Sequence, residues 1–168
     1  MARAVAASLT QTRLDFTNSI LIGTSGGSNI NKLQCVQNCL VKPVLQDNYD
    51  SATFLLSERH WLPLNKRINF KIATLAYQLL VFCQPTYLSS VLTPHQPQRS
   101  LRSVNQNLLS VPHCRSSSFG ESFSYCAPKI WNDIPLSVRQ PPSPDSFKGT
   151  LRRRLTCTFF SFNKKFNI

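Results

Sequence analysis

Apolar residues in the first half of the chain recur every third or fourth position, which is the spacing of amphipathic helices. The clearest case follows the Trp-Leu-Pro of residues 61–63, where Lys66, Arg67 and Lys71 fall outside an apolar seam. The seam consists of Ile68, Ile72, Leu75 and Leu79. The same spacing predicts helices over residues 2–22, from Ser28 to Val44, and from a capping Ser51 to Glu58.

Proline and serine interrupt this pattern in two places. Pro43 is expected to kink the second helix or to end it early, because proline lacks a backbone donor. Residues 61–63, Trp-Leu-Pro, predict a corner, beside which His60 is expected to be a packed capping residue. Nine of the eleven prolines follow residue 84, which argues against long helices between residues 85 and 144.

The second half nevertheless contains local signals. Residues 107–111 are compatible with a short strand, and residues 119–125 alternate apolar and polar positions as a second strand would. Trp131 and Ile134 are expected to anchor this arm on the helices. A last helix is predicted from Asp145, as N-cap, with an apolar residue at every fourth position: Phe147, Leu151, Leu155 and Phe159.

The predicted fold class is therefore mainly α, with an irregular arm, up to two short strands and a basic C-terminal helix. We expect three parts: a helical region over residues 1–84, a Pro/Ser-rich arm over residues 85–144 packed on the helices, and a basic amphipathic helix and tail over residues 145–168. A length of 168 residues is enough for one core. No apolar run approaches the 18 or so residues of a membrane span, so no membrane association is expected.

The excess of basic residues and the scarcity of acidic ones restrict the classes of function that the protein can have. Nineteen Lys and Arg against seven Asp and Glu give a net charge of +12, and most of the excess lies after residue 84. The seven carboxylates are scattered and no two are adjacent, whereas two-metal enzymes need clustered carboxylates. We also find no phosphate-binding glycine loop, HExxH or GxSxG motif, so we expect no catalytic residues, no metal site and no cofactor.

The six cysteines and the N-terminus allow other interpretations, which we consider weaker. A disulfide framework and a signal peptide are not indicated, so the thiols are expected to be reduced and mostly buried, in an intracellular protein that is nuclear or cytoplasmic and not secreted. Cys35 and Cys39 lie four apart, but no CxxC or His-x3-His partner accompanies them. The first fourteen residues are typical of an ordinary amphipathic helix. A mitochondrial presequence is the less favoured interpretation.

The basic residues are the candidate functional site. RNA or DNA binding, weak and salt-dependent, is expected from a set of eight: Lys148, Arg152, Arg153, Arg154, Lys164, Lys165, Arg99 and Arg102. Interleaved phenylalanines at 159, 160, 162 and 166 could stack on bases. The same cluster could instead be a solvated helix face or a nuclear localisation signal.

Six blocks, taken in order, resemble the region that follows the polymerase palm in reverse transcriptases of non-LTR (LINE-class, jockey-like) retrotransposons. Residues 13–21 are similar to that family's RLDYCNSLL and residues 32–38 to KLQRVQN, while residues 60–71 resemble HWLPxxxRIxFK, the most specific block. Residues 85–103 are similar to PxYLxxLLxP…RSLRS, residues 127–135 to APKLWNxLP and residues 147–155 to FKxxLKxxL. The chain departs from this pattern at Cys35, where the family usually carries Arg, and at Pro43.

The resemblance implies a thumb-like helical bundle that in the parent polymerase lies beside nucleic acid. It also implies that the palm, with its paired catalytic aspartates, lies upstream of the matched blocks, and no adjacent Asp pair occurs in these 168 residues. The expected function is thus a non-catalytic fragment of an RNA-directed DNA polymerase that retains nucleic-acid binding. The alternative is a domesticated protein-interaction module that binds a partner through an exposed seam of Ile68, Ile72, Leu75 and Leu79.

Overall fold

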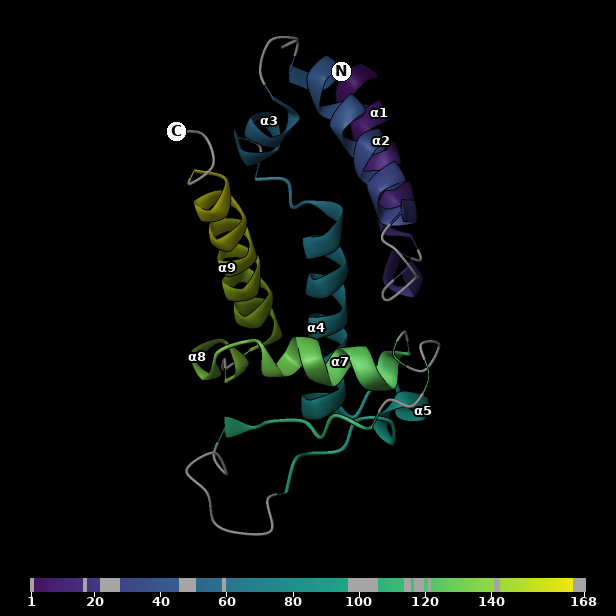
Figure 1. The fold of residues 1–168 in the computed structure, drawn as a ribbon, viewed down its shortest axis with the longest axis vertical. Helices are drawn as coiled ribbons and strands as arrows, with labels where there is room; N and C mark the ends of the chain where they lie inside the picture. The colour runs from purple at the N-terminus through teal and green to yellow at the C-terminus, as the bar shows by residue number, and fades with distance from the viewer. Residues whose placement is uncertain are drawn as a thin grey trace. The chain divides into compact units, whose positions relative to one another are not determined.

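The structure is a computed structural model, and it describes residues 2–16, 18–21, 28–45, 51–58, 60–96, 106–113, 116, 120, 122–140 and 143–164. Its elements follow in the order α1 (Ala2–Asp15), η1 (Asn18–Leu21), α2 (Ser28–Leu45), α3 (Ala52–Glu58), α4 (Leu64–Phe82), α5 (Thr86–Ser89), α7 (Phe123–Asn132), α8 (Leu136–Arg139) and α9 (Pro144–Lys164), as Figure 1 shows. This confirms the mainly α fold class.

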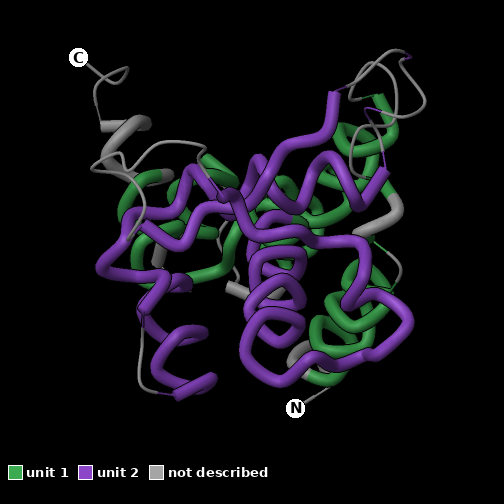
Figure 2. Tube along the Cα trace, turned by 90° about the horizontal axis from the view of Figure 1, so that it is seen from below, with its two compact units in different colours: residues 1–68, 153–168 green, residues 69–152 purple. Residues whose placement is uncertain are grey.

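The chain divides into two compact units, coloured separately in Figure 2. Unit 1 comprises residues 1–68 and 153–168, and unit 2 comprises residues 69–152. Helices α4 and α9 therefore each contribute residues to both units. These boundaries are not those of the three parts expected from proline and charge, because the two long helices cross from one unit into the other.

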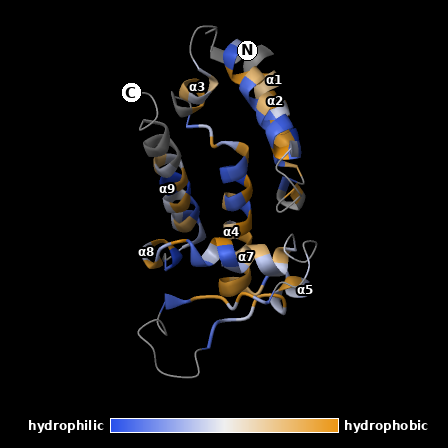
Figure 3. Cartoon of the chain, viewed as in Figure 1, coloured by the Kyte–Doolittle hydropathy of each residue, from blue (hydrophilic) through white to orange (hydrophobic). Residues whose placement is uncertain are grey.

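Helix α4 is buried on more than one side. Figure 3 shows hydrophobic residues gathering in its second half. Ile68, Ile72 and Leu79 of the expected seam are buried and Leu75 is half-buried. At about 100° per residue, Ala73 and Tyr77 lie opposite the seam, and both are buried as well. The expectation of an exposed seam is therefore wrong, because three of its four residues belong to the core.

Unit 1 has a small apolar core beneath its first helices. Helix α2 packs against both α1 and α3. Val41, Leu55 and Leu56 are fully buried together, and Ala52 and Trp61 pack against them. As expected, Ser51 caps α3 by accepting a hydrogen bond from the backbone N–H of Phe54 at 3.3 Å.

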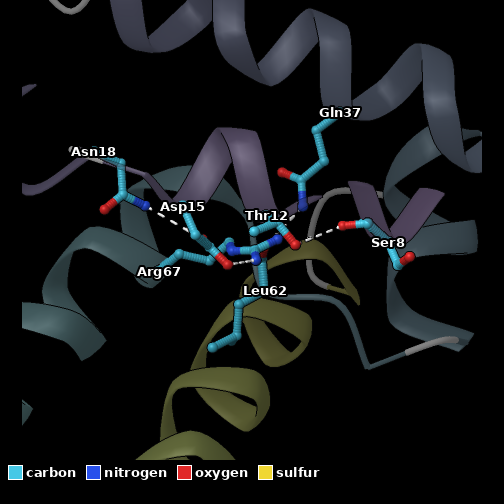
Figure 4. A network of polar contacts seen from close by, with 7 residues as sticks. All are labelled: Ser8, Thr12, Asp15, Asn18, Gln37, Leu62 and Arg67. Carbon is cyan, nitrogen blue, oxygen red and sulfur yellow. Dashed lines mark hydrogen bonds and ion pairs between the residues drawn. The ribbon is translucent and has the colours of Figure 1, made fainter. Parts of the chain in front are cut away.

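A polar network joins the helices of unit 1 (Figure 4). The Nε2 of Gln37, which is fully buried, donates to the carbonyl of Leu62 at 3.0 Å. Gln34 accepts from the backbone N–H of Leu64 at 2.8 Å and donates to Gln37 Oε1 at 3.0 Å. Gln34 thereby satisfies an N–H of the first turn of α4, a group that helices leave without an internal partner.

The same network contains an ion pair between Arg67 of α4 and Asp15, the last residue of α1. Asn18, which is buried, donates to the other carboxylate oxygen of Asp15 at 3.3 Å. Helix α1 ends at Asp15, where these contacts lie, and does not continue to residue 22 as predicted. Phe16 forms a turn and a 3-10 helix follows.

Unit 2 is built around three aromatic rings. The rings of Tyr77 and Phe147 are stacked, with centroids 4.4 Å apart and an interplanar angle of 11°. Trp131 of α7 lies 6.0 Å from Phe147, tilted by 36°. Trp131 and Ile134 are both buried, and the contact of Trp131 with Phe147 agrees with its expected part as an anchor.

Side chains of α7 and α8 hold the segment around Leu109. Asn132 accepts from the backbone N–H of Leu109 and donates to its carbonyl, both at 2.9 Å, as a neighbouring strand would. Trp131 Nε1 donates to the carbonyl of Asn107 at 2.8 Å, and Arg139 donates to the same oxygen at 3.3 Å. On its other side, Leu109 forms an isolated antiparallel bridge with Pro94.

Both strand predictions are wrong for the described residues. Residues 107–111 form only that single bridge, and the amide of Asn132 bonds to the backbone of Leu109 on the other edge. Residues 123–125 begin helix α7, while residues 119 and 121 lie outside the described residues. The helical spacing of Phe123, Ala127 and Trp131 outweighs the short alternation that precedes it.

Four local predictions also need correction. Pro43 lies inside α2, which continues to Leu45, so the proline does not end the helix early. His60 is exposed and adopts a positive φ of 52° at the corner, so it is not packed. Helix α9 starts at Pro144, and Ser143, not Asp145, is its cap.

The fourth correction concerns the thiols. Cys35, Cys39, Cys83 and Cys157 are free and exposed, and Cys126 is half-buried, so the described cysteines are not mostly buried. They lie on the outer sides or at the ends of helices, where the apolar core does not reach. Cys114 lies outside the described residues.

Candidate nucleic-acid interface

Helix α9 carries the basic residues and is fixed at its start. Ser143 Oγ accepts a hydrogen bond from the backbone N–H of Ser146 at 3.3 Å, and Pro144 occupies the first helical position, where its missing N–H costs nothing. Asp145 stands in the first turn, where a negative charge is stabilised by the helix dipole.

One face of α9 is bound into the core of unit 2. Phe147 and Leu151, four residues apart, are both fully buried, and Phe147 stacks on Tyr77. The rotation of the helix about its axis is therefore set by its apolar residues. This fixes the directions in which the arginines of the next turn project.

Arg152, Arg153 and Arg154 are all exposed. At about 100° per residue, Arg152 and Arg153 flank the direction opposite the buried face, and Arg154 lies nearer its border. Because the three arginines are consecutive, their exposed guanidinium groups project around the helix about 100° apart, outside a core that holds the helix in place. The arginine face is our name for Arg152, Arg153 and Arg154.

Lys148 lies one turn before Arg152 and is less available. Its ammonium group is 3.7 Å from the carboxylate of Asp145, which is almost fully exposed. An exposed pair of this kind is worth little and is screened by salt. Lys148 therefore extends the basic side of α9 toward its N-terminus, but with one neighbouring negative charge.

Other predicted site residues cannot be placed with this helix. Lys164 is the last residue of α9, and its side chain lies outside the described part of the chain, as do those of Phe159, Phe160 and Phe162. Lys165, Phe166, Arg99 and Arg102 also lie outside the described residues. The structure brings together Lys148, Arg152, Arg153 and Arg154 from the predicted set.

Sequence reasoning missed the role of the polar residues in the first three family-like blocks. Asp15 and Asn18 come from the first block, Gln34 and Gln37 from the second, and Leu62 and Arg67 from the third. In the structure these residues make polar contacts with one another, and Figure 4 draws all of them except Gln34. The sequence feature that could have indicated this network is a polar residue on the apolar side of a helix, such as Gln37 four residues before the buried Val41.

This network also removes a cation from the candidate surface. Arg67 belongs to the most basic stretch of the first half, yet it pairs with Asp15 and is mostly covered. Its function is to join α4 to α1 within unit 1. The arginine face is thus the basic cluster that the described residues present to solvent on one rigid helix.

The described residues contain neither a metal-binding group nor a membrane-spanning helix. They contain no group of three or more His, Cys, Asp or Glu side chains arranged to hold a metal ion. None of the described helices combines the length and apolar character required to cross a membrane.

Comparison of the chain with protein-family models, curated proteins and solved structures gave no match.

Proposed function

We propose that this protein binds single-stranded RNA or DNA through the arginine face, as a non-catalytic fragment of a non-LTR retrotransposon reverse transcriptase. The observation that carries the binding proposal is the two-sided character of α9. Phe147 and Leu151 are buried on one side, Arg152 and Arg153 project away from that side, and Arg154 is exposed at its border. Exposed guanidinium groups that project around one helix are suited to phosphates, since each offers several donors in a planar fork.

The charge of the surrounding sequence supports phosphate binding. From Lys148 to Ile168 the sequence holds six Lys or Arg and no acid. Contacts of this kind release counterions from the nucleic acid, so the affinity falls as salt rises. They carry no base readout, and we therefore propose binding with little sequence preference.

The proposed origin rests on the ordered sequence blocks and is supported by how their residues pair. Gln37 of the second block bonds to Leu62 of the third, and Asp15 of the first pairs with Arg67 of the third. Blocks that share one network would be retained together in a fold of common descent. A fragment of this origin is proposed to be intracellular, in the nucleus or cytoplasm, and to lack polymerase activity without palm carboxylates.

The test is a titration of a labelled single-stranded oligonucleotide at two salt concentrations. We expect affinity to fall steeply with salt for the natural protein. In a variant with Arg152, Arg153 and Arg154 replaced by Ser, the negative slope of log affinity against log salt should become shallower by about 2, because each lost contact with single-stranded phosphate contributes about 0.7.

A matched control separates local contacts from overall charge. Replacing Arg13, Lys32 and Lys71 by Ser removes the same charge from three other exposed positions. The control should keep the slope of the natural protein. Equal losses in the two triple variants, or binding that does not respond to salt, would contradict the proposal.

The interaction-module alternative is not supported in its original form. It depended on an exposed seam on α4, and three of the four seam residues are buried. We therefore propose no partner at that surface.

A further inference from the structure

Helix α2 exposes two thiols on one face. Cys35 and Cys39 are both free and both exposed, and they lie four residues apart. Side chains at this spacing are neighbours on a helix, with Cβ atoms about 5–6 Å apart. The same spacing allows two histidines of one helix to bind a single zinc ion in metalloproteases.

The rest of α2 orients this pair outward. Gln37 and Val41 are fully buried and, at about 100° per residue, lie on the opposite side of the helix from the thiols. Gln37 is held there by its bond to Leu62. The two sulfurs are therefore presented to solvent by a helix that cannot easily rotate them inward.

Two thiols supply half of the ligands that a thiophilic divalent ion takes. Structural Zn²⁺ is four-coordinate and tetrahedral, and a Cys₄ set is one of its common forms. Within one chain the described residues offer no group of three or more possible ligands. The described residues therefore do not complete the site, and a second copy of the chain is a source of two further thiols.

We propose that Cys35 and Cys39 form half of a Cys₄ site for a thiophilic divalent cation such as Zn²⁺, completed by the same two residues of a second copy of the chain. Binding replaces four S–H protons by four metal–sulfur bonds, so four protons are released for each ion bound by the two copies. No electron is transferred. This inference is independent of the proposed nucleic-acid binding.

Charge complementarity favours the second copy as the partner. Four thiolates around one divalent ion have a net charge of −2. Lys32 lies three residues before Cys35 and Lys42 three residues after Cys39, on the same side of α2. Two copies thus place four ammonium groups around the anionic centre, while Val36, which is 44% exposed, would gain cover beside it.

The experiment uses Co²⁺ as the probe, added to the full chain under anaerobic conditions with a reductant that is not a thiol. We expect thiolate-to-metal charge-transfer absorption and the visible bands of tetrahedral Co²⁺, both complete at one ion per two chains. Sedimentation should show a dimer that forms with Co²⁺ or Zn²⁺ and dissociates when a chelator is added.

Matched variants locate the ligands. Cys35→Ser and Cys39→Ser should each abolish the tetrahedral spectrum and the dimer, and both changes lie on an exposed surface. Cys83→Ser and Cys157→Ser, which alter equally exposed thiols elsewhere, should leave both readouts unchanged. A spectrum that survives Cys35→Ser, saturation at one ion per chain without a dimer, or no thiolate absorption at all would each overturn the proposal.

Discussion

The ring of Phe147 lies almost parallel to that of Tyr77, with the two centroids 4.4 Å apart. Seventy residues of sequence separate the two side chains, and Trp131 approaches Phe147 as well. Phe147 is fully buried in this cluster. The contact holds the start of α9 in unit 2, and thereby sets the side of the helix on which the arginine face lies.

Replacing Phe147 by Ala should lower the free energy of unfolding by about 3–5 kcal/mol, because it removes a buried ring and leaves a cavity. Chemical denaturation measures this. Phe147→Leu, which keeps most of the volume, should cost clearly less. Equal losses of unfolding free energy in the two variants would contradict the view that the volume of the Phe147 side chain stabilises this core.

Gln37→Leu should destabilise the protein by about 1–3 kcal/mol. Leucine nearly preserves the volume but leaves the buried carbonyl of Leu62 without its donor. Asn31→Ala, an exposed change on the same helix, is the control and should stay within about 0.5 kcal/mol. Comparable unfolding midpoints for the two variants would contradict a structural role for the network.

Asn132→Leu should weaken the segment around Leu109, because both hydrogen bonds from the amide are lost. We expect a loss of about 1–2 kcal/mol and faster hydrogen exchange at the Leu109 amide. Asn132→Asp keeps an acceptor for that amide but removes the donor to the Leu109 carbonyl. In Asn132→Asp the Leu109 amide should therefore exchange more slowly than in Asn132→Leu. The reverse order would contradict the hydrogen bond from the Leu109 amide to the side chain of residue 132.

Arg139→Met should be neutral or stabilise the protein by about 1 kcal/mol, as often happens when a poorly compensated buried charge is replaced by an apolar chain. Burial lowers the pKa of the Arg139 guanidinium below its usual value. Its Nε is buried and meets no acceptor among the described residues. The carbonyl of Asn107 keeps its bond from Trp131 in the variant. A loss above about 2 kcal/mol in thermal or chemical unfolding would show that the bond from Arg139 is needed.

Gly149→Ala should raise the free energy of unfolding by about 1 kcal/mol, because glycine is a poor helix former. A Cβ added there meets nothing within 4 Å. Nucleic-acid affinity should not change, since the arginine face is untouched. A destabilised Gly149→Ala would show that this side of α9 is covered in solution, which would also weaken the proposed function.

Much of the helical architecture could be predicted from periodicity. Ser51 as the cap of α3, the corner at residues 61–63 and the apolar face of α9 all depend on neighbours within about four residues. The errors lie where a distant side chain decides the outcome. Helix α1 ends where Asp15 meets Arg67, and the expected strand at residues 107–111 gives way to the amide of Asn132.

The candidate site shows the same division. The run Arg152–Arg154 and the apolar residues one turn away could be recognised from spacing alone. Arg67 was equally basic, and only its contact with Asp15 removes it from the surface. Exposure of Cys35 and Cys39 was also unpredictable, because a thiol packs in a core as readily as it projects from a helix.

The sequence by itself determined the mainly α class, the excess of basic residues and the local periods of its helices, because these depend on composition and on residues close in the chain. Tertiary structure alone decided that the α4 seam is buried, that Gln37 and Arg67 are structural and that Arg152–Arg154 face solvent. The physical reason is that burial and polar pairing depend on contacts between residues such as Tyr77 and Phe147, which local periodicity does not encode.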